Sequence, residues 1–264
     1  MAEPLENRLG VLDELLDEWG PHDDLAAELF AVVDALDSSA TLRRVITDPG
    51  TPENARRDFV RGVLAGKVSV TCIEFVARAA QRRWSGGRTF TAALERQAVR
   101  SELFRADRAG QLDETEDELF RFARVVESDG ALRNALSERA VGESHRESLV
   151  DELLQGRATP STVVLAKRAV GSRERTYGHA LESYINLAAA QKNRVIATVR
   201  VARPLTEDQL QRLRAGLARQ VGRDIALQVI VEPDLLGGVR VELGTEVIEG
   251  TVSGRLAEAR KLFS

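Results

Sequence analysis

The sequence predicts a mainly α-helical protein with a small α+β C-terminal domain, in which two tandem helical bundles precede a mixed strand and helix domain. Three observations support this prediction. Apolar residues recur at helical spacing as far as about Asn193, the chain repeats itself at an offset of 90 residues, and the apolar period changes to 2 from Val195 onward. We therefore expect a first helical bundle over 1–90, a second over 91–193 and an α+β domain over 194–264.

The internal repeat is visible as identical residues in register. Glu28-Leu29-Phe30 recurs 90 residues later as Glu118-Leu119-Phe120. The same offset relates Ser38 to Ser128, Leu42-Arg43 to Leu132-Arg133, Glu53 to Glu143, Arg56 to Arg146, Val60 to Val150, Leu64 to Leu154, Gly66 to Gly156 and Arg78-Ala79 to Arg168-Ala169. Unrelated helices share apolar spacing, but they do not share arginine, serine and glycine in register. The pattern therefore indicates a tandem duplication.

Both repeats carry helix signals. One apolar stripe in each repeat predicts an amphipathic helix, formed by Leu25, Leu29, Val32 and Leu36 in the first and by Leu119, Phe122 and Val126 in the second. Thr51 is expected to be the N-cap of a helix with Pro52 at its first position. Ser69 and Thr159 are expected to cap the next helix of each repeat. Long helices are expected from Thr91 to about Ala109 and from Arg175 to about Lys192.

The C-terminal region predicts a strand, a helix, a strand, a hairpin and a final helix. Thr206 and Gln209 form a capping box at the start of the first of these helices. The predicted strands carry alternating apolar residues: Val195, Ala197, Val199 and Val201; Ile225, Leu227, Val229 and Val231; and Val239, Val241 and Leu243. Gly244-Thr245 is a hairpin connection of the Gly-X kind. The final helix is predicted from the spacing of Leu256, Ala259 and Phe263.

The composition excludes several classes of protein. The 264 residues are 43% hydrophobic and 30% charged, which is typical of a soluble globular protein with helical surfaces. A net charge of -4 argues against nucleic-acid binding, because that binding depends on the neutralisation of phosphates. No stretch approaches the ~18 apolar residues of a membrane span, and the residues from Met1 to Glu6 do not form a signal peptide. We therefore expect a cytoplasmic protein.

No pattern in the sequence predicts catalysis, a cofactor or a metal. There is neither a Gly-x4-Gly-Lys-Ser/Thr phosphate loop nor a GxGxxG motif after a strand. His22, His145 and His179 are scattered, so none has a second ligand at metal spacing. Cys72 is the single cysteine, and its apolar neighbours predict a buried, unreactive thiol. The acidic run Asp113–Glu118 could bind a cation, but an acidic first helical turn favoured by the helix dipole is the simpler interpretation.

The last forty or so residues resemble a known family. The run Val231–Gly244 resembles the C-terminal signature of the delta subunit of F-type ATP synthases, whose mitochondrial counterpart is the oligomycin-sensitivity-conferring protein. The run Glu246–Leu256 resembles the close of the same signature. The residues that carry the resemblance are Pro233, Asp234, Gly237, Gly238, Gly244, Gly250, Arg255 and Leu256. Gly237-Gly238 precedes a predicted strand, which favours a bulge or tight turn over a ligand loop.

The resemblance implies a fold and a function. Family members have an N-terminal bundle of six helices and a small mixed C-terminal domain, a pattern that about 92–264 would cover. Residues 1–90 would then be an extra helical copy, as in the enlarged actinobacterial form. The family is not catalytic: it forms the peripheral stalk, linking the alpha/beta head to the b subunits and resisting rotor torque. The implied place is the cytoplasmic face of the bacterial cell membrane, peripheral and without a span, next to a separate b subunit.

The resemblance also implies partners. The second helical copy, about 92–192, is expected to hold the N-terminal helix of an alpha subunit, because it matches the layout of the ordinary subunit. The first copy is expected to brace the stalk or the head. The alternative is a free-standing helical-repeat adaptor unrelated to ATP synthase, which the duplication allows but which leaves the C-terminal signature unexplained. An enzymatic function has no residues to support it.

Overall fold

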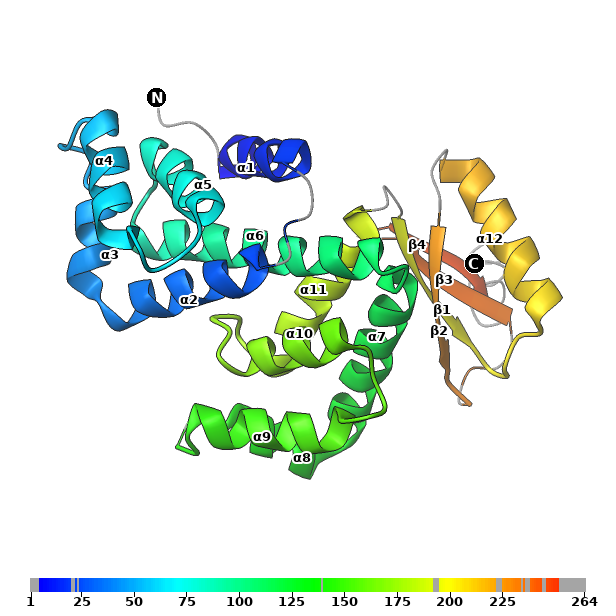
Figure 1. Cartoon of the computed structure of the whole chain (residues 1–264). Coiled ribbons are helices and arrows are strands. Elements are labelled where there is room, and N and C mark those ends of the chain that lie inside the picture. The colour runs from blue at the N-terminus through cyan, green and yellow to red at the C-terminus, as the bar shows by residue number, and fades with distance from the viewer. Residues whose placement is uncertain are drawn as a thin grey trace, which may run out of the picture. The chain divides into compact units, whose positions relative to one another are not determined.

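The computed structural model describes residues 5–19, 22, 24–138, 140–191, 195–221, 225–233, 235, 238–243 and 246–251 (Figure 1). The chain consists of two compact units, Met1–Tyr184 and Ile185–Ser264; the first holds the helical repeats up to Tyr184, and the last helix of the second repeat continues into the second unit. The predicted fold class is confirmed, since the first unit is built from helices and the second contains one small sheet. No helix in these ranges is both long enough and apolar enough to cross a membrane.

The helices of the two repeats follow each other in the same order. The first repeat begins with α1 (Leu5–Trp19), α2 (Leu25–Ser38), α3 (Ala40–Thr47), α4 (Glu53–Leu64) and α5 (Val70–Gln81). A long helix follows, α6 (Gly87–Arg108). The second repeat continues with α7 (Leu112–Ser128), α8 (Gly130–Ser137), α9 (Glu143–Leu154), α10 (Pro160–Val170) and α11 (Tyr177–Gln191). Helices α3, α4, α6 and α8, α9, α11 begin at an offset of 90 residues, as the sequence repeat predicts.

Equivalent hydrogen bonds confirm the duplication. The buried guanidinium of Arg56 in α4 donates to the carbonyl oxygen of Ala80 at 2.8 Å. Its counterpart Arg146 in α9 donates to the carbonyl oxygen of Val170, 90 residues beyond Ala80, at 3.2 Å. Each arginine therefore ties one helix to the C-terminal end of the next, which explains why this residue type recurs in register.

The N-termini of α5 and α10 repeat a second arrangement. The Ser69 hydroxyl accepts from the backbone of Cys72 at 3.2 Å, and the Thr159 hydroxyl accepts from the backbone of Thr162 at 3.3 Å, so both predicted caps are confirmed. A glutamate from the preceding apolar helix accepts from the backbone amide of each cap residue, Glu28 at 2.7 Å and Glu118 at 2.8 Å.

The cap predicted at Thr51 is wrong. Helix α4 begins at Glu53, with Pro52 in the N-cap position and no side-chain cap. The backbone of Pro52 is extended at ψ 145°, so it cannot be the first helical residue. The Thr51 hydroxyl instead donates to the carboxylate of Asp48 at 2.8 Å. This hydrogen bond, with a second from the backbone of Gly50, lowers the pKa of Asp48.

Helix α6 belongs to both repeats. Its start, Gly87, lies 90 residues before the start of α11, while Glu95 within it lies 90 residues after the start of α1. Its first part is therefore the last helix of the first repeat, and its later part is the first helix of the second. Helix α6 packs against α1, α2, α3 and α5 and also against α7 and α10. Every residue from Gln97 to Leu103 is buried, which covers about two full turns and hence all faces of the helix.

The start of α6 also differs from the prediction of Thr91. The helix begins at Gly87, which sequence patterns assign to a loop. A Cβ atom at Gly87 would lie 2.7 Å from the Cβ atom of Arg43 in α3. The glycine is required by this close approach and does not end the helix.

After the end of α11, the described part of the second unit is a four-stranded sheet with one helix. Its elements are β1 (Val195–Val201), α12 (Glu207–Val221), β2 (Ile225–Val231), β3 (Gly238–Leu243) and β4 (Glu246–Thr251), and the strand order is β2-β1-β3-β4. Strands β1 and β2 are parallel and joined through α12, whereas β3 is antiparallel to β1 and β4 is antiparallel to β3. The core of this unit contains Ala197, Val199, Val201, Leu217, Ile225 and Val241.

The predicted capping box at the start of α12 is confirmed. The Thr206 hydroxyl accepts from the backbone of Gln209 at 3.3 Å, and the Gln209 side chain accepts from the backbone of Thr206 at 2.8 Å. The predicted connection Gly244-Thr245 and the predicted final helix with Leu256, Ala259 and Phe263 lie outside the described residues.

Candidate functional site

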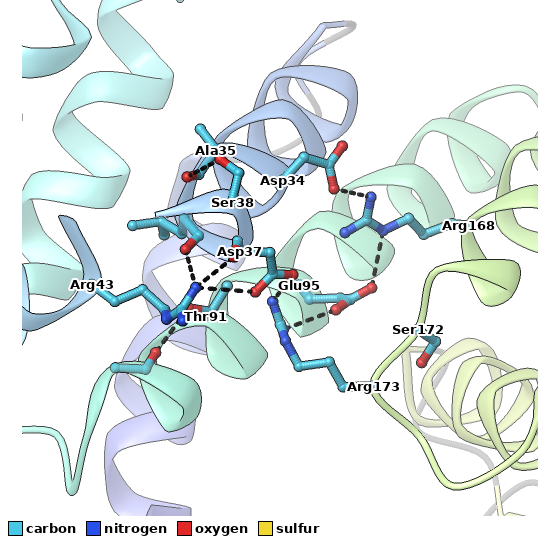
Figure 2. A network of polar contacts seen from close by, with 12 residues as sticks. Asp34, Ala35, Asp37, Ser38, Arg43, Thr91, Glu95, Arg168, Ser172 and Arg173 are labelled. Atoms are coloured by element: carbon cyan, nitrogen blue, oxygen red, sulfur yellow. Dashed lines mark hydrogen bonds and ion pairs between the residues drawn. The ribbon is translucent and has the colours of Figure 1, made fainter. Parts of the chain in front are cut away.

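A network of ion pairs connects the two helical repeats (Figure 2). We call it the inter-repeat joint; it consists of Asp34 and Asp37 in α2, Glu95 in α6, Arg168 in α10 and Arg173 after α10. The guanidinium of Arg168 contacts Asp34 at 2.6 Å and Glu95 at 2.9 Å. The guanidinium of Arg173 contacts Glu95 at 3.2 Å and also pairs with Asp37. Each arginine therefore joins a carboxylate of α2 to the same carboxylate of α6.

The centre of the joint is shielded from water. The side chains of Glu95 and Arg168 are 10% and 12% exposed, whereas that of Asp34 is 62% exposed. Burial raises the pKa of Glu95, because loss of hydration disfavours the carboxylate more than Arg168 and Arg173 favour it. The Arg168 guanidinium also lies over the ring of Phe30 in α2, 4.8 Å from its centroid. The net stability that the joint adds is small compared with the strength of its contacts, because removing its charges from water offsets much of the gain from pairing them.

Only one of the two α2 carboxylates of the joint has an acidic counterpart in the second repeat. Ninety residues after Asp34 and Asp37 the chain has Arg124 and Glu127, which pair with each other at 2.6 Å on α7. Sequence reasoning missed the joint, since Arg168 was singled out only as a repeated residue and Glu95 only as part of a helix. The change from aspartate to arginine at an otherwise matching position is the signal that could have marked this surface.

Three residues of the C-terminal signature are described, and they lie after β2, at the start of β3 and in β4. Pro233 is exposed and Gly238 opens β3 at a φ of 89°, a left-handed conformation that favours glycine. Gly250 pairs with Val239 across the ladder between β3 and β4. The predicted signature residues Asp234, Gly237, Gly244, Arg255 and Leu256 lie outside the described residues.

Two of these signature residues line a surface hollow. The hollow has a volume of about 590 Å³, and Pro233 and Gly238 line it together with Val201, Pro204, Leu205 and Leu235. Arg203 and Gln209 also line the hollow, so it offers polar as well as apolar contacts to a partner.

The predicted candidates for chemistry have structural roles where the structure describes them. Cys72 is fully buried, and burial, with a smaller effect from Glu28, raises its pKa to about 12, so its thiol is unreactive. Asp113 and Glu114 lie in the first turn of α7, as predicted, and Glu118 holds the start of α10. Within the described ranges, no group of three or more His, Cys, Asp or Glu side chains could hold a metal ion.

Comparison with known proteins identifies relatives of the whole chain. The ATP synthase delta (OSCP) subunit family matches residues 103–263. The ATP synthase subunit delta of Kineococcus radiotolerans is 45% identical over 89% of this chain and 85% of its own length. The corresponding proteins of Beutenbergia cavernae and Streptomyces avermitilis are 43% and 42% identical, over 90% of this chain and 88% and 87% of theirs. A chain of the Toxoplasma gondii mitochondrial ATP synthase hexamer is 18% identical over 64% of this chain and 96% of that chain, with a TM-score of 0.38.

The family match begins at Leu103, in the later part of α6, and runs to the C-terminal region. The relatives at more than 40% identity also cover most of the first repeat, so the enlarged form is shared with actinobacterial proteins. The alternative of a helical-repeat adaptor unrelated to ATP synthase is therefore wrong. The chain belongs to the ATP synthase delta (OSCP) subunit family.

Proposed function

We propose that this chain is the peripheral-stalk subunit that links the catalytic alpha/beta head of ATP synthase to its b subunits and holds the head against the torque of the rotor. Its family is a structural, non-catalytic component of that enzyme. Such a link needs two binding surfaces and a stiff connection between them. Two attachments on one chain favour permanent association, because the first raises the effective concentration of the second.

The observation that carries this proposal is that α6 is shared between the repeats. No loop separates them: α6 is one continuous helix from Gly87 to Arg108 (Figure 1), and its central residues Gln97–Leu103 are all buried. The inter-repeat joint adds ion pairs beside it. A hinge between the repeats would let a twisting force turn one relative to the other, and this arrangement leaves no place for one.

Each partner is assigned to a separate part of the chain. The second repeat, which matches the ordinary subunit, holds the N-terminal helix of an alpha subunit, and the first repeat braces the head or the stalk. The C-terminal unit binds the distal ends of the b subunits, and the hollow lined by Leu235 is the proposed contact. The chain then lies at the cytoplasmic face of the bacterial cell membrane as a peripheral component.

Reconstitution tests this proposal. Purified full-length chain, alpha/beta head and the soluble part of b are mixed in pairs and together, and complexes are measured by sedimentation velocity. We expect the chain to bind each partner and to bring head and b into one complex. If head and b associate equally well without it, the proposed link is wrong.

A pair of variants tests the assignment of b. Leu235→Asp places a charge in the hollow and is expected to weaken binding to b without affecting the head. Val221→Asp is the matched control, because Val221 is an exposed apolar residue of the same unit that does not line the hollow. If both variants bind b equally well, the hollow is not the binding site for b.

A further inference from the structure

The arginines of the joint have counterparts in the first repeat that form no ion pair with a carboxylate of the described residues. Arg168 and Arg173 lie 90 residues after Arg78 and Arg83. Each arginine of the later pair contacts two carboxylates. Among the described residues, no carboxylate lies within ion-pairing distance of Arg78 or Arg83. As far as the structure describes it, the first repeat therefore presents the arginine half of a joint without the acidic half.

Arg78 shares one feature with Arg168, a contact with an aromatic ring. Arg78 is exposed and its guanidinium lies over the ring of Trp19 in α1 of its own repeat, 5.4 Å from the centroid, whereas Arg168 lies over Phe30 of the other repeat. Glu74 lies one turn before Arg78 on α5, but both of its oxygens accept from Arg61 in α4, at 2.8 and 2.7 Å. These hydrogen bonds lower the pKa of Glu74, and the charge of Arg78 helps to lower it.

Arg83 is the second of the two arginines, and we call the surface formed by Arg78 and Arg83 the edge of the first repeat. Its backbone carbonyl accepts from the guanidinium of Arg8, while its own side chain is exposed. Because its backbone is held and its side chain is not paired, Arg83 is placed to contact a partner without a rearrangement of the loop between α5 and α6.

The joint itself shows which kind of partner fits such arginines. Its acidic half comes from α2, an amphipathic helix that presents Phe30, Asp34 and Asp37 at positions i, i+4 and i+7 along one side. The remaining face of α2 is apolar and buried in its own repeat. The complementary partner is therefore an amphipathic helix with two carboxylates one turn apart.

Another molecule of this chain does not supply that helix. Its α7 occupies the place of α2 in the second repeat, but Arg124 stands where α2 has Asp34. Arg124 would face Arg78 with like charge, and it already pairs with Glu127 at 2.6 Å. Association through this edge is thus directed away from copies of the chain and toward a different protein.

We infer that the edge of the first repeat formed by Arg78 and Arg83 is a docking site for an acidic amphipathic helix of another ATP synthase subunit. The inference rests on the proposed function, which supplies that subunit. It gives the first repeat a role of its own, a second attachment to the complex through arginines at the positions equivalent to Arg168 and Arg173.

The test uses full-length chain and ATP synthase purified without this subunit, with the dissociation constant measured at physiological salt. The variant Arg78→Glu/Arg83→Glu reverses both charges of the edge. The matched control is Arg82→Glu/Arg88→Glu, because these exposed arginines of the same segment correspond to Ser172 and Gly178 in the second repeat and have no part in a joint. We expect the first variant to bind about tenfold to a hundredfold more weakly and the control to change about threefold at most.

The possible results separate the two proposals. If wild-type chain does not bind the depleted enzyme, the proposed function fails. If wild type binds and both double variants bind equally well or equally weakly, the proposed function stands and the docking site is wrong. A photo-crosslinker at position 83 is expected to join a helical segment with two carboxylates three or four residues apart, and a crosslink to a basic segment would overturn the inference. So would self-association of the free chain that Arg78→Glu/Arg83→Glu abolishes.

Discussion

Removal of Arg168 measures what the inter-repeat joint contributes. In R168M the Glu95 carboxylate, whose side chain is only 10% exposed, keeps one partner, Arg173 at 3.2 Å. Asp34 is 62% exposed and returns to water at little cost. Breaking a buried pair costs about 3 to 5 kcal/mol when the remaining charge is left alone. Because Arg173 stays, and the contact with Phe30 is worth up to ~1 kcal/mol, we expect the free energy of unfolding to fall by about 2 to 3 kcal/mol.

The duplication provides a control at the equivalent position. R78M removes an arginine that also stacks on an aromatic ring but that pairs with no carboxylate of the described residues, so its cost should stay below ~1 kcal/mol. Urea unfolding of the full-length proteins, followed by far-UV circular dichroism, measures both values. Adding E95Q to R168M removes the stranded carboxylate and should restore about 1 kcal/mol or more. If R168M costs no more than R78M, the argument that the joint is a shielded, two-sided pair is refuted.

Three further predictions concern pH, packing and buried hydrogen bonds. The pKa of Glu95 is raised from an ordinary 4.5, so the folded state binds this proton more tightly than the unfolded state. The free energy of unfolding of wild type relative to E95Q should therefore rise as the pH falls from 7 through that raised pKa toward 4.5. Urea unfolding at each pH measures this difference. Gly87→Ala forces a Cβ against Arg43 and should lower the free energy of unfolding by about 1 to 3 kcal/mol. Gly62→Ala, in open space within α4, should raise it by up to ~1 kcal/mol. Equal melting temperatures of the two variants would contradict the packing argument. Arg56→Met leaves several buried carbonyls without a donor and should cost about 3 kcal/mol in the same assay, and a loss below ~1 kcal/mol would show that water replaces the guanidinium.

Residues that act within one repeat were accessible from the sequence. Arg56 and Arg146 recur because each is buried and donates to carbonyls at the end of the following helix, so a change at either position would leave those carbonyls unpaired. The strands of the second unit were also predictable from the sequence, because their side chains alternate between the core and the other face and apolar residues therefore recur at every second position. In both cases the determining contacts are local or lie in a regular ladder.

The sharing of α6 between the repeats and the inter-repeat joint could not be predicted from the sequence in the same way. A helix buried on all faces has no polar side, so the run Gln97–Leu103, which includes charged residues, does not show the one-sided apolar stripe that identifies an amphipathic helix. The pairing of Arg168 with Asp34 depends on how one repeat sits against the other, over a sequence separation of 134 residues. No local pattern encodes that placement; only the break in the repeat at Arg124 points to it.

The shared helix has a mechanical consequence for a link under torque. A linker between two bundles passes force through single bonds with free rotation, and each such bond is a place where the link can twist. Helix α6 has 22 residues and is therefore about 33 Å long, and its backbone hydrogen bonds run without interruption from one repeat into the other. Twisting the repeats against each other would have to unwind this helix or slide it within a packing that covers all of its faces. A duplication that merges the last helix of one bundle with the first helix of the next thus lengthens the subunit without adding a hinge.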